Sequence, residues 1–319
     1  MEKAIAKHRF SLKVLTLNIF LRPPFVKTNS SDHKNPRLNY FIQNCMQSYD
    51  LICLQEMFAS FSSRKEKLKK AAREMGFFYM AESPNPGWLE GSLVDGGLLV
   101  LSKYPIVQTD FETYSDSMDT DSLSQKGCLY TQVAVDTKTF HVFSTHMQAS
   151  YSTSNFQKYR SYRNVRRTQL QEIRRFMDHK ASEQGTVLLL GDLNIDARAE
   201  SKPRVFSEDI DYQDEYAECM SILSGEGRVK VRDIMRERYG ESPSTYGRVD
   251  EKGQPLERVL TAPRVQNSDE SIDYVLLFGE IEEGTQIDFE QTEVVPFYVE
   301  NQPFTQMSDH AGLQALFYW

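Results

Sequence analysis

The chain has 319 residues, of which 40% are hydrophobic and 26% are charged, and its formal net charge at pH 7 is −8. This composition is typical of a globular protein, and the lack of internal repeats and long low-complexity runs excludes a solenoid or a disordered chain. Because phosphate contacts require clustered lysine and arginine, we expect no nucleic-acid partner for a chain with this acidic balance.

Apolar segments with strand-like patterns outnumber helical ones along the chain. Strands are expected at residues 12–18, 50–56, 77–81, 97–102, 130–135, 140–146, 187–190, 271–278 and 308–319. Helices are expected near residues 37–47, 62–75, 157–179 and 211–223. In the second helix, Ser62 or Ser63 is placed to cap the N-terminus and Gly76 to end it. This pattern predicts two β-sheets packed face to face with helices outside.

One expected helix is strongly basic, with arginine at positions 160, 163, 166, 167, 174 and 175. Its apolar residues recur at helical spacing, which predicts an amphipathic helix with a solvated basic face. The alternative is that this face approaches anionic lipid headgroups. The polar stretches 196–204 and 246–269 are expected to be surface insertions.

The four cysteines, Cys45, Cys53, Cys128 and Cys219, match no zinc-binding spacing and are expected to be free thiols. The N-terminal residues contain no apolar segment of the signal-peptide kind, and no apolar run has the length of a spanning helix. We therefore expect a cytoplasmic protein, with peripheral membrane contact left open.

Six of the strand-like segments carry polar residues at one end. In GDLN, Asp192 and Asn194 follow an apolar run and project from one face, because residues two apart in a strand point the same way. The other polar positions are Asn18, Glu56, His146, Asp273, Asp309 and His310. Turn chemistry explains one such position, whereas six strand ends favour one shared site. Because these positions run from Asn18 to His310, we expect a single domain over residues 1–319.

The polar strand ends occur in the order NIF, QE, STH, GDLN, IDYV and SDH. In this order they resemble the endonuclease/exonuclease/phosphatase superfamily of metal-dependent phosphodiesterases. The segments GGLLVLSKYPI (96–106), KGCLY (126–130) and THMQASY (145–151) are similar to its neutral sphingomyelinase branch. The resemblance implies an α/β (α+β) fold, a four-layered αβ/βα sandwich of two mostly antiparallel sheets flanked by helices. It also implies phosphoester hydrolysis with Mg²⁺, Mn²⁺ or another divalent ion.

Three positions are expected to hold the metal. Mg²⁺ prefers oxygen ligands and needs only one or two carboxylates from the protein. Glu56 resembles the metal-binding glutamate of the family, and Asn18 resembles an asparagine that either binds the metal through oxygen or donates to phosphate. Asp309 is placed to reach the same metal or a second one.

Five positions are expected to act on the substrate. Asp192 orients or deprotonates the attacking water, and Asn194 holds a phosphate oxygen. His146 and His310 flank the phosphate as acids or bases, because imidazole changes charge near neutral pH. Asp273 accepts a hydrogen bond from His310 and fixes its orientation. Whether Asp192 or His310 is the general base is left open.

The resemblance implies a phospholipase C-type hydrolase that cleaves sphingomyelin or a related choline phospholipid by attack of water on phosphorus. Aromatic faces bind the choline cation. Residues 297–304 are expected to line the site mouth, whereas residues 77–79 are more typical of core, and Trp88 lies in a loop that could touch lipid. The sequence shows no long apolar hairpin like that of secreted lipid-cleaving members. How the protein reaches lipid in a bilayer is therefore left open.

Two alternatives remain at this point. The same fold also serves nucleases and phosphatases that act on inositol phosphates or nucleotides, and a nuclease requires a basic groove near Asn18 and His310. A catalytically silent binding module is the second alternative, which is disfavoured because every matched position carries a chemically competent residue.

Overall fold

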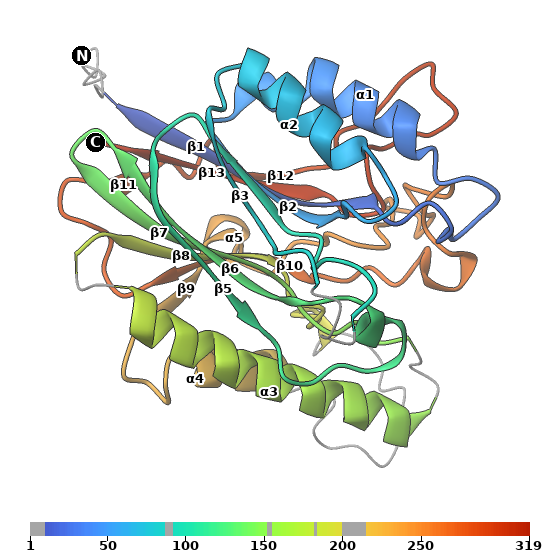
Figure 1. The fold of residues 1–319 in the computed structure, drawn as a ribbon. Coiled ribbons are helices and arrows are strands. Elements are labelled where there is room, and N and C mark those ends of the chain that lie inside the picture. Colours follow the sequence, from blue (N-terminus) through green and yellow to red (C-terminus); the bar gives the residue numbers. More distant parts are fainter. Residues whose placement is uncertain (1–9, 87–91, 152–154, 182–183, 200–214) are drawn as a thin grey trace.

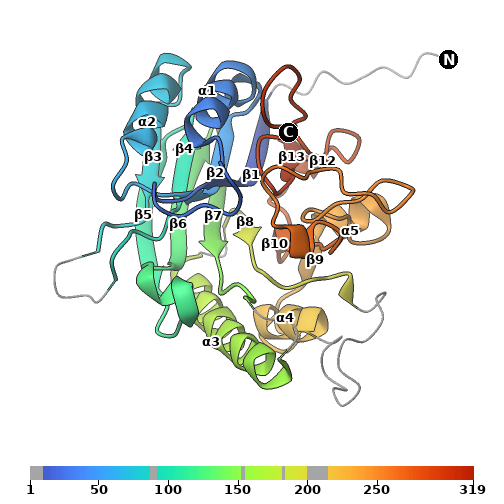
Figure 2. The ribbon, with the colours of Figure 1, turned by 90° about the vertical axis from the view of Figure 1, so that its right-hand side faces the viewer.

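Two β-sheets pack face to face in the computed structural model, and helices cover the outer side of each sheet (Figure 1). The structure describes residues 10–86, 92–151, 155–181, 184–199 and 215–319. Figure 2 shows the four layers from the side, with α1 and α2 above one sheet and α3 and α4 below the other. The expected αβ/βα sandwich is confirmed.

The first sheet has the strand order β11-β13-β1-β2-β4-β3, and β12 also pairs with β13. Its strands are β1 (Ser11–Leu21), β2 (Leu51–Met57), β3 (Tyr79–Glu82), β4 (Leu99–Ser102), β11 (Gln286–Ile287), β12 (Glu293–Val295) and β13 (Gly312–Tyr318). Among the strand pairs of this sheet in the described residues, β1–β2 is parallel and the others are antiparallel. Their register sets Asn18 opposite Gln55, so Asn18 and Glu56 lie at the same end of the sheet.

The second sheet has the order β5-β6-β7-β8-β10-β9. Its strands are β5 (Ile106–Thr113), β6 (Gly127–Val135), β7 (Lys138–His146), β8 (Thr186–Asp192), β9 (Val231–Asp233) and β10 (Asp273–Phe278). The parallel pair β7–β8 sets His146 opposite Asp192, and the antiparallel pair β8–β10 sets Asp273 opposite Asp192. Strand β5 was not predicted from the sequence, because this edge strand is mostly exposed and lacks an apolar alternation.

The helices are α1 (Lys34–Asn44), α2 (Arg64–Glu74), α3 (Phe156–Lys180), α4 (Glu215–Leu223) and α5 (Ile234–Tyr239), with short 3₁₀ turns at Met46–Ser48, Asp119–Leu123 and Pro263–Val265. Ser63 stands at the N-cap position of α2, but its side chain accepts no capping hydrogen bond. Gly76 follows the helix with a φ of +92°, as the sequence predicts. Part of the expected helix 211–223 and of the stretch 196–204 lies outside the described residues. Within the described chain, no helix combines the length and apolar character needed to span a membrane.

Three apolar layers fill the sandwich. One lies between the sheets and contains Leu12, Val14 and Val142, one lies under α1 and α2, and one lies under α3 and α4. Because each sheet is covered on both sides, strands such as β1 are apolar on both faces. All four cysteines are buried and free, which confirms that expectation.

Three arginines of α3, at positions 163, 166 and 167, form ion pairs with α4, which corrects part of the expected solvated face. Arg160, Arg167 and Arg175 are exposed, as expected for such a face. Arg166 is buried and binds Glu215 through two nitrogens, at 2.7 and 2.9 Å. Arg163 pairs with Glu218 at 2.8 Å. These arginines therefore fix one helix on another rather than forming a free cationic surface.

Candidate functional site

The polar strand ends meet at one edge of the two sheets. Asn18 Nδ2 lies 3.1 Å from Glu56 Oε1 on β2 and 3.0 Å from Asp192 Oδ2 on β8. Since β1 and β2 belong to one sheet and β8 to the other, the Asn18 amide joins the two sheets. Glu56 and Asp192 therefore lie side by side, although they are distant in sequence.

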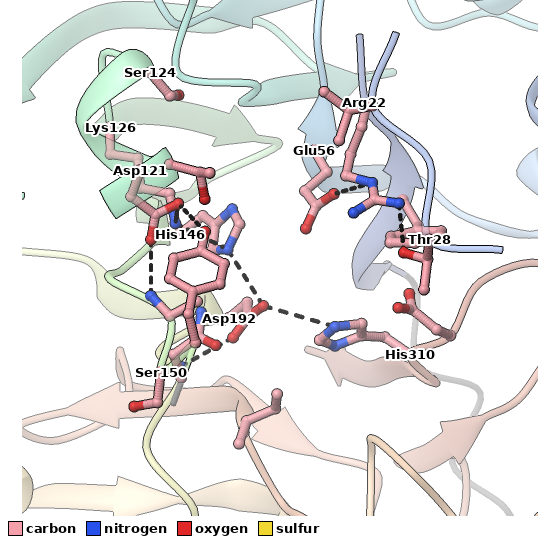
Figure 3. Close-up of a pocket in the computed structure, with 18 of the residues that line it drawn as sticks. Arg22, Thr28, Glu56, Asp121, Ser124, Lys126, His146, Ser150, Asp192 and His310 are labelled. Atoms are coloured by element: carbon pink, nitrogen blue, oxygen red, sulfur yellow. Dashed lines mark hydrogen bonds and ion pairs between the residues drawn. The ribbon is translucent and has the colours of Figure 1, made fainter. Parts of the chain in front are cut away.

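Asp192 lies between two histidines (Figure 3). Its Oδ2 is 3.5 Å from His146 Nε2 and 3.9 Å from His310 Nε2. Burial raises the pKa of the Asp192 carboxyl well above its usual range. A carboxyl group whose pKa moves toward neutrality is suited to accept a proton from water.

His310 is paired with a carboxylate on its other ring nitrogen. Its Nδ1 lies 2.9 Å from Asp273 Oδ2, and both side chains are buried. Burial opposes the imidazolium charge, but the adjacent Asp273, together with Asp192 and Asp309, raises the pKa of His310 well above its usual range. His310 is thus held protonated, as a hydrogen-bond donor beside Asp192.

His146 has the opposite character. Burial, the positive charge of Lys126 and that of His310 lower its pKa well below the usual range, so its imidazole is neutral. Lys126 Nζ lies 3.2 Å from His146 Nε2, 2.9 Å from Asp121 Oδ1 and 2.7 Å from the carbonyl of Met147. Lys126 immediately precedes β6, and nothing in its local sequence KGCLY indicates that it reaches the site.

Glu56 and Asp309 fit a hard divalent cation. Glu56 Oε2 is buried without a hydrogen-bond partner, and its nearest cationic atom is Arg22 Nε at 4.0 Å. Burial, reinforced by the Glu56 charge, raises the pKa of Asp309 to about 6. Glu56 is partly buried and Asp309 is buried. Two such carboxylates that repel one another are stabilised by a cation, and carboxylate oxygens are the ligands that Mg²⁺ prefers.

A second set of ligand-type atoms adjoins the first. Atoms of Asp192, Asp273 and His310 lie within 4.8 Å of one another, which is close enough to share an ion. However, His310 Nδ1 already pairs with Asp273, and the charge of the protonated ring repels a cation. The unpartnered oxygen of Glu56 therefore makes Glu56 and Asp309 the better metal-binding pair.

The two asparagines act as donors in this structure. Asn18 Oδ1 accepts the N–H of Phe20 at 3.1 Å, so its NH₂ group faces the carboxylates. The backbone N–H of Asn194 donates to Asp192 Oδ1 at 2.9 Å, and its side chain donates to the carbonyl of Met147. Metal binding by Asn18 and phosphate binding by Asn194 stay predictions.

These residues surround a cavity of about 850 Å³. Six of the eight predicted positions line it directly: Glu56, His146, Asp192, Asn194, Asp309 and His310. Asn18 lies behind Glu56 and Asp192, and Asp273 lies behind His310. The cavity is large enough for the headgroup of a phospholipid together with part of its backbone.

The stretch 246–269 is more than the expected surface insertion. Tyr246 lines the cavity, its backbone pairs with those of Glu270 and His310, and its ring centroid is 4.7 Å from that of the His310 imidazole. Thr245 is fully buried and binds the backbone of β10 through its hydroxyl. Tyr246 contacts His310 and Thr245 binds the backbone of Asp273, and their polar, irregular sequence gave no sign of this.

The expected aromatic mouth is wrong in its residues. Phe304 is buried in the core, and Phe297 packs against Phe41. Phe77 is buried in the core as expected, whereas Phe78 is 68% exposed. Tyr298 is exposed, but neither it nor Phe297 lines the cavity, and Trp88 lies outside the described residues. Aromatic residues of other segments line it instead: Phe20 of β1, Tyr159 of α3, and Phe25, Phe58, Phe61, Tyr151 and Tyr246 outside helices and strands.

Residues 15–310 match the model of the endonuclease/exonuclease/phosphatase family. A sphingomyelinase of Dictyostelium discoideum is 33% identical, over 93% of this chain and 77% of the relative. A crystal structure of sphingomyelinase C from Streptomyces griseocarneus has a TM-score of 0.65 at 24% identity, covering 96% of this chain and 98% of that one. A beta toxin mutant of Staphylococcus aureus with bound magnesium ions has a TM-score of 0.65 at 18% identity, covering 96% and 99%. These two structures share the fold.

Proposed function

The chain belongs to the endonuclease/exonuclease/phosphatase family, in its sphingomyelinase branch, and from that membership we propose that it is a divalent-metal-dependent phosphodiesterase acting on sphingomyelin or a related choline phospholipid. Water attacks phosphorus and loses a proton, the bond from phosphorus to the lipid oxygen breaks, and that oxygen takes up a proton and leaves as the alcohol of the lipid while phosphocholine is released. The sphingomyelinase relative, which matches nearly the whole chain, supports this choice of substrate.

One observation carries the proposal: the Asn18 amide lies within hydrogen-bond distance of both Glu56 and Asp192. The carboxylate suited to a cation and the carboxyl suited to a proton acceptor are thereby neighbours. A phosphodiester hydrolase needs these two functions side by side, because the phosphate charge must be neutralised where the water is activated.

The metal proposed is Mg²⁺, which Glu56 and Asp309 would hold, with Asn18 next to Glu56. When bound, it supplies positive charge to the phosphate oxygens. Two observations support a hard cation of this kind: the unpartnered buried oxygen of Glu56, and the magnesium ions bound by a beta toxin of the same fold.

Three side chains of the protein act on the attacking water and on the phosphate. Asp192, with its raised pKa, takes the proton of the attacking water. His310 is held protonated by Asp273 and donates a hydrogen bond to a phosphate oxygen, where negative charge increases in the transition state. Asn194 donates to a second phosphate oxygen. We thus assign the general base, which the sequence left open, to Asp192.

Nuclease activity is not favoured, because acidic side chains outnumber basic ones in the cavity lining. The acidic lining residues are Glu56, Asp121, Asp192, Asp196, Glu215, Glu270 and Asp309, against Arg22, Lys126, Arg166 and Arg264. A groove that binds a polyanion such as a nucleic acid requires more basic than acidic side chains. Cytoplasmic location and a single domain over residues 1–319, which rest on the sequence, stay predictions.

The test is a substrate panel with purified protein in Mg²⁺ and in EDTA. We expect phosphocholine from sphingomyelin or lysophosphatidylcholine in Mg²⁺, none in EDTA, and recovery when Mg²⁺ is restored. No turnover is expected with oligonucleotides, inositol phosphates or nucleotides. Preferential cleavage of any of these three classes would refute the lipid assignment.

A further inference from the structure

Exposed apolar side chains gather around the mouth of the catalytic cavity. Phe25 is 85% exposed, Phe61 69%, Leu93 65%, Leu123 47% and Val26 44%, and all five line the cavity that contains Glu56, Asp192 and His310. We call these five residues the apolar rim. They come from four separate segments: the loop after β1, the loop after β2, the segment before β4 and the 3₁₀ turn at Asp119–Leu123.

The segment that carries Phe61 is rigidly anchored. Buried Asp95 accepts the backbone N–H groups of Ala59 and Ser60, at 2.9 and 3.3 Å. Asp95 is itself held by buried Lys65 of α2, at 2.6 Å. Phe61 is thus presented to solvent by a fixed turn.

The backbone of Phe61 is strained although its side chain is mostly exposed. Its φ is +60°, a left-handed conformation that is costly for a bulky aromatic residue. Most of its side chain nevertheless remains in water, so core packing does not explain the strain. Among the described residues, its ring contacts that of Phe25, which is still more exposed and whose centroid is 6.3 Å away.

The other side of the rim is held by backbone pairing. The N–H groups of Leu93 and Val94 both donate to the carbonyl of Leu123, at 2.8 and 3.1 Å. This pairing fixes two exposed leucines next to one another. Clustered apolar groups on rigid loops mark an interaction surface, whereas single exposed apolar residues need no explanation.

From this arrangement we propose that the apolar rim enters the acyl region of a lipid bilayer and so places the cavity mouth at the level of the headgroups; this inference rests on the proposed function. A phospholipid has its charged phosphodiester next to its acyl chains. The cavity has the matching order, with a charged floor at Glu56 and Asp192 and an apolar rim outside. A protein seated on the rim would instead cover the mouth through which substrate enters.

Charge indicates which kind of membrane fits. The chain carries a net charge of −8, and acidic residues predominate in the cavity. Anionic vesicles are therefore repelled, and binding depends on apolar contact. We expect the protein to bind zwitterionic vesicles with little dependence on salt concentration.

The experiment uses vesicles of phosphatidylcholine and sphingomyelin, with EDTA during binding so that no lipid is consumed. The double variant Phe25→Ser/Phe61→Ser removes the two rim aromatics. The matched control, Phe78→Ser/Tyr298→Ser, removes two aromatics that are 68% and 56% exposed but lie outside the cavity lining. Thermal melting of each variant confirms that it remains folded.

If each aromatic contributes about 1.4 kcal/mol to the binding free energy, its removal lowers the affinity tenfold. We therefore expect the rim variant, which lacks two aromatics, to bind vesicles about 100-fold more weakly. The control should bind like the wild type. With Mg²⁺, the rim variant should lose at least tenfold more activity on vesicles than on p-nitrophenylphosphocholine, a soluble ester that needs no bilayer.

Equal vesicle binding by the rim variant and the wild type would overturn the proposal, as would an equal loss in the control. Preference for anionic vesicles, or a dimer that the rim substitutions dissociate, would overturn it too. A wild type that binds vesicles through the rim but hydrolyses neither substrate would refute the proposed function and leave the docking surface supported.

Discussion

The imidazole Nδ1 of His310 lies 2.9 Å from Oδ2 of Asp273, and this contact joins the two sheets of the sandwich. His310 precedes β13 of the first sheet, and Asp273 begins β10 of the second. The orientation and charge of His310 therefore depend on a residue from the opposite layer. An active site built in this way is sensitive to any change that shifts one sheet against the other.

Replacing Asp273 by Asn removes the charge that keeps His310 protonated while preserving the size of the side chain. We expect kcat/KM for phosphocholine release to fall by about 10²–10⁴-fold, by analogy with the loss of an orienting carboxylate in a triad. Near-UV circular dichroism should match that of the wild type. A loss of less than threefold would show that His310 acts without Asp273.

Thr245 ties both partners of this contact together. Its hydroxyl oxygen accepts the N–H groups of Ile272 and Asp273, at 3.1 and 3.3 Å, and its carbonyl accepts the N–H of Ala311 at 2.8 Å. Thr245→Val leaves the first two donors unpaired in a buried place. We expect kcat to fall about tenfold with KM nearly unchanged, because His310 and Asp273 lose their alignment.

The hydroxyl is the group under test, so Thr245→Ser is the matched control and should restore most of kcat. If serine and valine lower kcat equally, then the methyl packing of Thr245, and not its hydrogen bonds, positions the two strands. A change confined to KM would likewise count against an alignment role.

Glu56→Gln should separate metal binding from folding. A ligand that binds only the folded state raises its stability, so Mg²⁺ should raise the Tm of the wild type above its value in EDTA. In the variant this rise should be absent. Because Glu56 repels Asp309, the variant in EDTA should be at least as stable as the wild type. An undiminished Mg²⁺ shift would place the metal elsewhere.

Gly191, the residue before Asp192, allows β7 and β8 to approach closely. Its φ is +134°, and a Cβ there would lie 2.0 Å from the carbonyl oxygen of Thr145. We expect Gly191→Ala to lower the free energy of unfolding by at least about 2–3 kcal/mol, measured by urea denaturation. Gly279→Ala is the control: its φ is +69° with nothing within 4 Å of the added atom, so its cost should be roughly 1 kcal/mol.

Sequence patterns predicted the strands and the polar residues at their ends. Apolar runs that end in Glu56, His146 or Asp192 indicate the strands themselves and the ends at which they stop, and the ordered motifs indicated the family. The register that sets His146 and Asp273 on either side of Asp192 came only from the structure. Register depends on pairing between distant strands, which one sequence does not reveal.

Residues that reach the site only through tertiary contacts were not predicted from the sequence. Lys126 reaches His146 from the segment just before β6, and Tyr246 reaches His310 from an irregular segment. The aromatic residues were assigned to the wrong loops for the same reason, because apolar segments on the core side and at the cavity mouth look alike in sequence. Phe304 proved to be core, whereas Phe25 and Phe61 stand at the mouth.

The central claim is that Asp192 activates water for attack on phosphorus within this metal-dependent site. Its most direct test is sphingomyelin hydrolysis in H₂¹⁸O with Mg²⁺, followed by mass spectrometry of both products, for the wild type and for Asp192→Asn. The account predicts ¹⁸O in phosphocholine and none in ceramide, with the rate of the variant reduced at least about 10³-fold. Label in ceramide, or an Asp192→Asn variant that turns over like the wild type, would contradict it.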